Sequence, residues 1–269
     1  MTEQELILTS IRGCRRVDLY ARPVPLSPEQ EARFRGILAR RQAGEPLQYL
    51  LGECEFMGSP FYVDSRVLIP RPETEHLAEW AIEKILLLGT TRQLEILDVG
   101  TGSGAIAVSL AKLCPGCHVT ALDFSEAALD VARRNAERNQ VSDRVEFVCA
   151  DIFSWTPSGK IFDAVVSNPP YIPSAKIAFL PPDVRKEPVS ALDGGPDGLR
   201  FYRRIVGACA EWLALDGFLM MEMGDGQRPE IERLLHSTAS FVGLEFRRDL
   251  AGTDRIFAAR RLSPTGQIP

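Results

Sequence analysis

The 269-residue sequence lacks a long apolar segment and has no internal repeat or low-complexity tract. No run of about 18 apolar residues occurs, so no transmembrane helix is predicted. The first residues are acidic and polar before a brief apolar run, which does not fit a secretory signal. We therefore expect a cytoplasmic protein without a membrane contact.

Cysteine is present but has no disulfide-like arrangement. Its six residues are scattered, mostly in apolar surroundings, as is typical of reduced thiols in a cytosol. Cys114 and Cys117 have the spacing of half a zinc site or of a redox pair, but no second pair accompanies them. We interpret them as part of a helix-to-strand turn with incidental thiols and predict no metal site.

An excess of positive charge is also lacking. The net charge is -5 and the pI is near 5.4, which argues against a partner bound mainly through its phosphates. We expect no direct requirement for nucleic acid. The N-terminal part is an exception, with arginines that form either solvated helix faces or a contact surface for an acidic or RNA-associated partner. They are Arg12, Arg15, Arg16, Arg22, Arg33, Arg35, Arg40 and Arg41.

The hydrophobic content of 45% is enough for a sizeable core. Capping-box spacing at Thr2 with Glu5, and at Ser27 with Gln30, predicts two early helices. Pro28 lies at the favoured first position of the second helix. Residues 1–52 are therefore expected to form a small helical domain.

A connecting β-hairpin is expected next. Residues 53–69 alternate apolar and polar positions and are interpreted as two strands around Gly58 and Ser59. The Pro-Arg-Pro-Glu-Thr-Glu segment ends this linker, which we place at 53–75. The periodicity of residues 73–88 predicts an amphipathic helix.

Residues 76–269 alternate strand-like and helical segments. Five apolar strand candidates, LEILDV, HVTALD, RVEFVC, FDAVVSN and GFLMMEM, alternate with helical stretches at 104–113, 125–139, 198–214 and 227–238. The last two strands, VGLEFRR and DRIFAAR, have no helix between them, which suits an antiparallel edge. The fold class is therefore α/β, with a doubly wound, Rossmann-like sheet of seven strands.

A glycine-rich loop follows the first strand of this sheet. In Asp-Val-Gly-Thr-Gly-Ser-Gly, residues 98–104, glycines allow a sharp turn and close approach to a ligand. Asp123 ends the second strand, where a carboxylate can bond both hydroxyls of a ribose. The Gly-x-Gly-x-Gly spacing resembles motif I of class I S-adenosyl-L-methionine (AdoMet) methyltransferases, and Asp98 could face a positively charged amino-acid moiety. An NAD enzyme and a purely structural turn remain alternatives.

The predicted cofactor site is completed by residues after later strands. Ile152 either contacts the adenine or belongs to the core. The cofactor-binding residues that we expect are Gly100, Thr101, Gly102, Ser103, Gly104, Asp123, Ile152 and Asn168.

The Asn-Pro-Pro-Tyr motif at the end of the fourth strand is the strongest chemical signal. The Asn168 side chain and the carbonyl of Pro169 can accept both hydrogens of a planar amino or amide group, while Tyr171 packs against it. We predict Asn168, Pro169 and Tyr171 as catalytic residues, and the same three with Pro170 as substrate-binding residues. The motif is shared by enzymes that methylate adenine N6, guanine N2 and glutamine N5, so it identifies a planar nitrogen only.

Five segments together resemble the HemK-type (PrmC) peptide chain release factor N5-glutamine methyltransferases. They are GEPLQYLLGECEFMGSPFYVDSRVLIPRPETE, ILDVGTGSGAIAVSLA, SNPPYI, EPVSALDGGPDGLRFYRRI and DLAGTDRIF. The resemblance implies methyl transfer from AdoMet to the glutamine of a Gly-Gly-Gln loop in class I release factors, with S-adenosyl-L-homocysteine as product. It also implies a release-factor-binding role for residues 1–52, and we expect a monomer.

Two sister activities stay open as alternatives. Enzymes that methylate a glutamine of ribosomal protein L3 usually have Pro-Arg-Ser-Pro where this chain has Pro-Arg-Pro-Glu-Thr at 70–74, which favours the release factor enzyme. A nucleic-acid amino-methyltransferase is the other alternative. The family often has an aromatic residue where Ile152 stands, so stacking on adenine is in doubt there.

Two further features have two interpretations each. Arg71 and Glu73 either line the rim of the pocket or form salt bridges between domains. The proline-rich segment 173–188, with the Asp-Gly-Gly-Pro-Asp-Gly loop at 193–198, is either a lid or an irregular connector.

Overall fold

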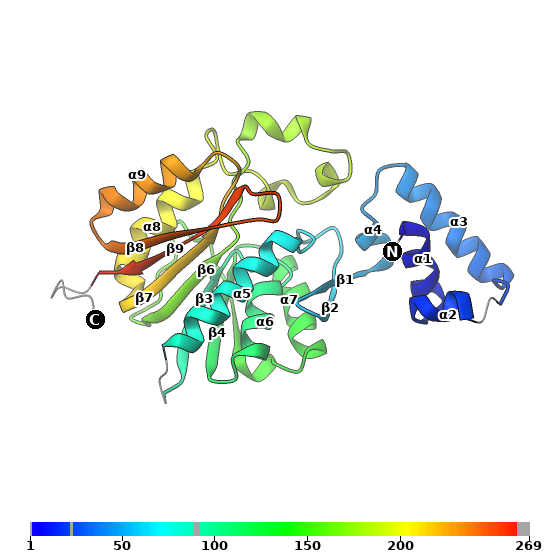
Figure 1. Ribbon diagram of the computed structural model, residues 1–269, viewed down its shortest axis with the longest axis horizontal. Coiled ribbons are helices and arrows are strands. Elements are labelled where there is room, and N and C mark those ends of the chain that lie inside the picture. Colours follow the sequence, from blue (N-terminus) through cyan, green and yellow to red (C-terminus); the bar gives the residue numbers. More distant parts are fainter. Residues whose placement is uncertain (1, 22–23, 89–91, 263–269) are drawn as a thin grey trace.

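The computed structural model describes residues 2–21, 24–88 and 92–262. Arg22, one of the clustered arginines, lies outside the described residues. The described chain has a helical N-terminal part, a short hairpin and a large α/β part that follow one another in space (Figure 1).

Four helices form the N-terminal part: α1 (Glu3–Arg12), α2 (Arg16–Ala21), α3 (Pro28–Gln42) and α4 (Leu47–Leu51). Both predicted capping boxes are confirmed, with Thr2 and Ser27 as the N-caps of α1 and α3. A small core of Ile7, Ile37 and Leu47 holds α1, α3 and α4 together. The part is therefore a helical unit with its own apolar centre, separated from the sheet by the hairpin (Figure 1).

The clustered arginines of this part mostly have acidic partners. Five of them form ion pairs: Arg15 with Asp18, Arg16 with Glu5, Arg35 with Glu31, Arg40 with Glu45, and Arg41 with Glu3 and Asp183. Exposed pairs of this kind stabilise a fold little, but they neutralise the local charge. This pairing favours solvated helix faces over a basic contact surface.

The predicted hairpin exists, but it is shorter than expected. Strands β1 (Glu53–Phe56) and β2 (Ser59–Tyr62) pair antiparallel around Met57 and Gly58, which both have positive φ. The turn was therefore misplaced by one residue. The second strand was also expected to reach residue 69, but Asp64 ends the pairing because it accepts the N–H of Arg66 and begins a turn.

A seven-stranded sheet forms the centre of the α/β part, as predicted. Its strands are β3 (Leu94–Val99), β4 (Cys117–Asp123), β5 (Val145–Cys149), β6 (Phe162–Ser167), β7 (Leu213–Glu222), β8 (Phe241–Arg248) and β9 (Asp254–Arg261). Their order is β5-β4-β3-β6-β7-β9-β8. The first five are parallel, and β9 pairs antiparallel with both β7 and β8. The antiparallel edge is confirmed, with β9 inserted inside it.

Helices cover both faces of the sheet. One face packs against α5 (Pro72–Leu87), α6 (Ala105–Leu113) and α7 (Glu126–Arg138), and the other against α8 (Arg200–Trp212) and α9 (Arg228–Thr238). Consecutive strand residues therefore enter opposite cores, as Met220 and Met221 do. Among the described residues, no helix is long and apolar enough to cross a membrane.

Candidate active site

A cavity of about 510 Å³ opens at the carboxyl ends of β3, β4, β5 and β6. This is the edge at which doubly wound sheets bind their ligands, and the volume is typical of a small-molecule site. Seven of the predicted site residues line it: Gly100, Gly102, Asp123, Ile152, Asn168, Pro169 and Pro170. The fold therefore brings both predicted motifs to one cavity.

Asp98, Thr101, Ser103 and Gly104 are absent from the cavity lining and support the glycine loop from behind. Thr101 donates its hydroxyl to Asp98 Oδ2 at 2.7 Å, and the N–H of Ala107 bonds the same oxygen at 3.1 Å. Gly104 precedes α6, where an added Cβ would lie 3.0 Å from the Cβ of Ala132. Asp98 is buried and does not line the cavity. Through these two hydrogen bonds it fixes the glycine loop to α6.

Ser103, which we also expected to bind the cofactor, lies behind the loop. It is buried, and its carbonyl accepts a hydrogen bond from Asn135 at 2.8 Å. Direct cofactor contacts by Thr101, Ser103 and Gly104 stay predictions.

Asp123 holds the loop and faces the cavity. Its Oδ2 accepts the N–H of Gly102 at 2.9 Å, and its Oδ1 accepts the N–H of Ser125 at 2.9 Å. Burial raises the pKa of Asp123 from its usual range. Each oxygen keeps a second lone pair, so the carboxylate can still accept two hydroxyl groups.

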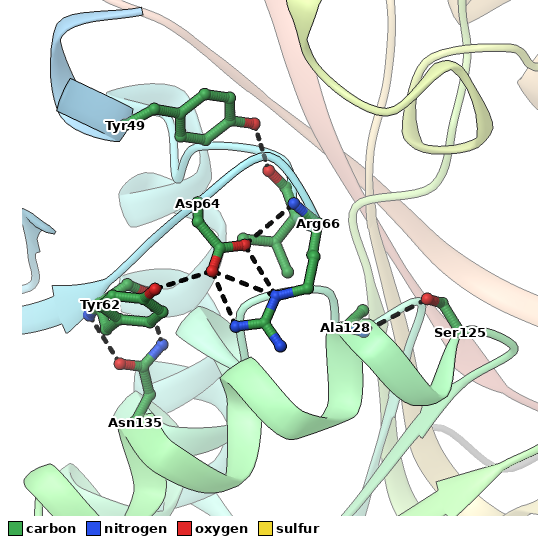
Figure 2. Close-up of polar contacts among 8 residues, drawn as sticks. Tyr49, Tyr62, Asp64, Arg66, Ser125, Ala128 and Asn135 are labelled. Carbon is green, nitrogen blue, oxygen red and sulfur yellow. Dashed lines mark hydrogen bonds and ion pairs between the residues drawn. The ribbon is translucent and has the colours of Figure 1, made fainter. Parts of the chain in front are cut away.

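The segment that follows the hairpin forms one wall of the cavity, which sequence reasoning missed. Arg66, Val67 and Leu68 line this wall. Figure 2 shows how the segment is held: Arg66 is paired with Asp64, and the hydroxyl of Tyr49 in α4 bonds the carbonyl of Val67 at 2.5 Å. The wall is thus tied to the N-terminal helices.

Asn135 of α7 holds the base of the same segment. Its side chain accepts the N–H of Tyr62 at 2.7 Å and donates to the carbonyl of Tyr62 at 2.9 Å (Figure 2). A buried amide that satisfies both backbone groups of one residue fixes where the hairpin leaves the sheet domain.

Aromatic side chains line the cavity beside Ile152. Phe124 and Phe153 are partly exposed there, and Arg200 stacks over the Phe153 ring at 4.3 Å. Ile152 itself lines the cavity and belongs to the core on the α8 side. The core interpretation therefore fits, and its contact with adenine stays a prediction. Phe153, which sequence reasoning missed, supplies an aromatic surface next to the expected position.

In the second motif, Asn168 Nδ2 donates to Thr74 Oγ1 at 2.9 Å. In the described part of the chain, no hydrogen bond is donated to Asn168 Oδ1 or to the carbonyl of Pro169. These two oxygens are therefore free acceptors on neighbouring residues, and we call the pair the acceptor corner. Tyr171 does not line the cavity, because its ring packs into the core and its hydroxyl bonds Glu222 at 3.1 Å. A contact of Tyr171 with substrate stays a prediction.

The loop at 193–198 lies directly against this motif. Ile172 pairs with Asp193, and the N–H of Gly194 bonds the carbonyl of Ile172 at 2.9 Å. An added Cβ on Gly198 would lie 2.3 Å from the carbonyl oxygen of Tyr171. The glycines therefore let the loop support the backbone of the motif.

Arg71 pairs with the buried Glu187, whose other oxygen accepts the N–H of Ile69 at 3.0 Å. Arg71 and Glu73 are absent from the lining of the large cavity, so the salt-bridge interpretation fits Arg71. Pro188, the last residue of the proline-rich segment, and residues 189–191 do line the cavity. Whether that segment moves as a lid stays a prediction.

The described residues contain no group of three His, Cys, Asp or Glu side chains that could hold a metal ion. Cys114 and Cys117 are buried at the end of α6, where the N–H of Cys117 bonds the carbonyl of Cys114 at 2.9 Å. They lie in a helix-to-strand turn, as we interpreted them.

Known proteins resemble this chain in sequence and in fold. A family model described as the PrmC N-terminal domain matches residues 2–52, and one described as a methyltransferase domain matches residues 96–180. Among solved structures, the ribosomal protein L11 methylase of Lactobacillus delbrueckii subsp. bulgaricus has a TM-score of 0.53 and 22% identity, over 75% of this chain and 84% of that chain. The hMettl16 catalytic domain has a TM-score of 0.61 and 16% identity, over 90% and 85%. These two share the fold.

Curated relatives match along nearly the whole chain. The release factor glutamine methyltransferase of Geobacter sulfurreducens is 43% identical over 261 residues, which is 96% of this chain and 88% of that protein. The protein of the same name from Chlorobaculum tepidum is 44% identical over 260 residues, 93% of this chain and 87% of that protein. The chain therefore belongs to the release factor glutamine methyltransferase family and is an AdoMet-dependent enzyme.

Proposed function

We propose that this enzyme methylates the N5 amide nitrogen of the glutamine in the Gly-Gly-Gln loop of class I release factors. The observation that carries the proposal is the pair of acceptors, Asn168 Oδ1 and the Pro169 carbonyl, at one end of the cavity. A primary amide has two N–H hydrogens, and two fixed acceptors match them. A hydroxyl or a thiol would leave one acceptor unsatisfied.

The rest of the cavity fits AdoMet. At Gly100 and at Gly102, an added Cβ would meet nothing closer than 4.0 Å, so the loop leaves space for a ligand against its backbone. Asp123 would bond the ribose hydroxyls, and the apolar surfaces of Ile152 and Phe153 would contact the adenine. AdoMet would supply an electrophilic sulfonium methyl group at this site.

The chain itself contributes mainly orientation. An amide nitrogen is a poor nucleophile because its lone pair is delocalised. Asn168 Oδ1 and the Pro169 carbonyl would hold both amide hydrogens in place, which turns the face of the nitrogen toward the cavity. The nitrogen loses one proton when it gains the methyl group, and that proton becomes acidic late, so no strong base is needed.

Asp123→Ala is expected to weaken AdoMet binding by about 10- to 100-fold, because hydrogen bonds to a charged acceptor are lost in a buried site. Calorimetric titration with AdoMet measures the effect. Asp130→Ala is the matched control, since Asp130 lies exposed on α7 and, among the described residues, forms its ion pair with Arg133. An unchanged dissociation constant for Asp123→Ala, with a normal melting temperature, would rule out this role.

The substrate is tested with the purified enzyme, AdoMet and a class I release factor, followed by peptide mass spectrometry. We expect one added methyl group on the Gly-Gly-Gln glutamine and none on a Gln→Ala release factor. Ribosomal protein L3 and RNA are included as competing substrates. Methylation of either one, with the release factor unmodified, would refute the proposal in favour of a sister activity.

The helical part, residues 2–52, is proposed to bind the release factor, and the enzyme is proposed to act as a cytoplasmic monomer without nucleic acid. The separate apolar core of this part supports the first point. Its link to the cavity wall through Tyr49 would place a bound partner beside the acceptor corner.

A further inference from the structure

We propose that Thr74 and Glu222 are positioning residues that fix the direction of the Asn168 amide, so that its oxygen faces the substrate. This inference rests on the proposed function of Asn168 as an acceptor. It adds two residues, from α5 and β7, to the part of the site that decides which substrate nitrogen can be held.

The fold brings these residues together at one sheet edge. Strands β6 and β7 are parallel neighbours, with Ser167 opposite Met221, so the next residues are Asn168 and Glu222. Thr74 lies in the first turn of α5, which packs across the end of β7. All three residues thus meet although they are far apart in the sequence.

Two hydrogen bonds connect them, and a third joins Glu222 to Tyr171. Asn168 Nδ2 donates to Thr74 Oγ1 at 2.9 Å, and Thr74 Oγ1 donates to Glu222 Oε2 at 2.7 Å. Tyr171 donates its hydroxyl to Glu222 Oε1 at 3.1 Å. Thr74 is 4% exposed and Glu222 is 1% exposed, so water does not compete for these bonds.

The direction of these hydrogen bonds follows from the number of hydrogens that each group carries. A threonine hydroxyl has a single hydrogen, and an ionised carboxylate can only accept. Thr74 must therefore give its hydrogen to ionised Glu222, which leaves its oxygen to accept from Asn168. The amide nitrogen then faces Thr74, and the amide oxygen faces the cavity.

Protonation of Glu222 would permit the opposite direction. A neutral carboxyl group can donate to Thr74, and Thr74 can then donate to Asn168 Oδ1. The amide nitrogen would turn toward the cavity, where its hydrogens would oppose those of a substrate amide. The acceptor corner thus depends on an ionised Glu222.

The surroundings place this titration near neutral pH. Burial raises the pKa of Glu222 to about 7, while the hydrogen bonds from Thr74 and Tyr171 lower it. Among charged groups, Glu73 raises this pKa and Arg255 lowers it. Tyr202 also lies close, with its hydroxyl bonded to the backbone carbonyl of Glu222 at 2.9 Å. Since an acid is ionised above its pKa, the correct direction is present at higher pH and is lost as the pH falls through about 7.

An ionised carboxylate such as that of Glu222 is unfavourable in free energy when it is buried in an apolar core. Replacing a buried charge by an apolar group of similar size often stabilises a protein. In the described part of the chain, the side-chain hydrogen-bond partners of Glu222 are hydroxyl groups. A function at the neighbouring acceptor explains why an acid stands in the apolar strand Leu-Met-Met-Glu-Met.

Thr74→Val removes the hydroxyl but keeps the shape of the side chain. We expect the rate of methyl transfer to a release factor at saturating substrate to fall by about 10- to 100-fold. AdoMet affinity is expected to stay within about twofold of the wild type, because Thr74 does not line the cavity. Thr74→Ser restores the hydroxyl and should recover activity to within about threefold.

Glu222→Gln tests the direction of the bonds. The wild-type rate should fall with decreasing pH below about 7, whereas the variant, which cannot ionise, should lose this dependence between pH 5.5 and 8.5. At pH 8 the variant should be about three- to tenfold slower, because its amide can bond Thr74 in either orientation.

Asn168→Ala, measured in the same assay, separates the positioning role of Thr74 and Glu222 from the acceptor role of Asn168. If Asn168→Ala is inactive while Thr74→Val and Glu222→Gln keep the wild-type rate and pH profile, the positioning role is refuted and the proposed function stands. If Asn168→Ala is fully active, the acceptor role itself fails. Melting temperatures are measured for every variant, and equal activity losses in Thr74→Val and Thr74→Ser would also overturn the inference.

Discussion

Asn168→Ala is expected to reduce methyl transfer by about a thousandfold while AdoMet still binds nearly as tightly as to the wild type. The variant loses one of two acceptors that would hold the amide, so the poor nucleophile is no longer oriented. Asn168 follows β6, whose Ser167 lies opposite Val99 at the start of the glycine loop. The hydrogen bonds that hold the loop, such as that from Gly102 to Asp123, do not involve the Asn168 side chain. For this reason, the loss should fall on the chemical step and spare cofactor affinity.

The measurement is single-turnover methyl transfer to a class I release factor, paired with calorimetric titration of AdoMet. Ser237→Ala, on the exposed side of α9, is the control for a small polar deletion elsewhere. A comparable loss of AdoMet affinity and of activity in Asn168→Ala would contradict the role that we assign to this side chain.

Gly198→Ala is expected to lose most activity and to lower the free energy of unfolding by about 2–4 kcal/mol. Gly198 has a φ of +77°, and its added Cβ would lie 2.3 Å from the carbonyl oxygen of Tyr171 and 2.7 Å from Gln227 Nε2. Gln227 Nε2 donates to that same carbonyl at 3.0 Å. The clash would therefore displace the backbone that carries the acceptor corner.

Gly207→Ala is the matched control for this substitution. Gly207 lies inside α8, and an added Cβ there would meet nothing within 4 Å, so the change should stabilise the enzyme by about 0.5–1 kcal/mol. Urea unfolding and the methylation assay are run on both variants. If Gly198→Ala were as stable and as active as Gly207→Ala, the support of the motif by this loop would be disproved.

Local sequence patterns predicted much of the fold. The helix expected at 125–139 is observed as Glu126–Arg138, and the one expected at 227–238 as Arg228–Thr238. The hairpin turn was placed one residue too late because Met57 takes a positive φ that glycine or asparagine would usually supply. Local reasoning failed there because a tertiary contact can override a residue's own preference.

Part of the candidate site also followed from local patterns. The glycine loop and the Asn-Pro-Pro-Tyr motif each follow a strand, and a parallel sheet puts the ends of its strands at one edge. The sequence therefore predicted that the two motifs belong to a single site. Ligand contacts by the residues of both motifs stay predictions, and Thr101, Ser103, Gly104 and Tyr171 are absent from the cavity lining.

Other parts of the site had no local signal. Arg66 to Leu68 looked like the end of a strand. Long-range contacts, such as the bond of Tyr49 to Val67 and those of Asn135 to Tyr62, hold this part of the chain beside the cavity (Figure 2). Glu222 is an acid in an apolar strand, which marks it as unusual but does not give its partner. Thr74 looked like part of a helix start.

The sequence by itself determined the strand and helix periodicities, the two ligand motifs and the family resemblance, because these depend on neighbouring residues. Tertiary structure alone decided which face of each motif meets the cavity and which residues stand behind it. Asn168 and Thr74 are 94 residues apart, and Thr74 and Glu222 are 148 apart. Hydrogen bonds across such separations depend on strand order and helix packing, which bring distant residues together without leaving a trace in their local sequence.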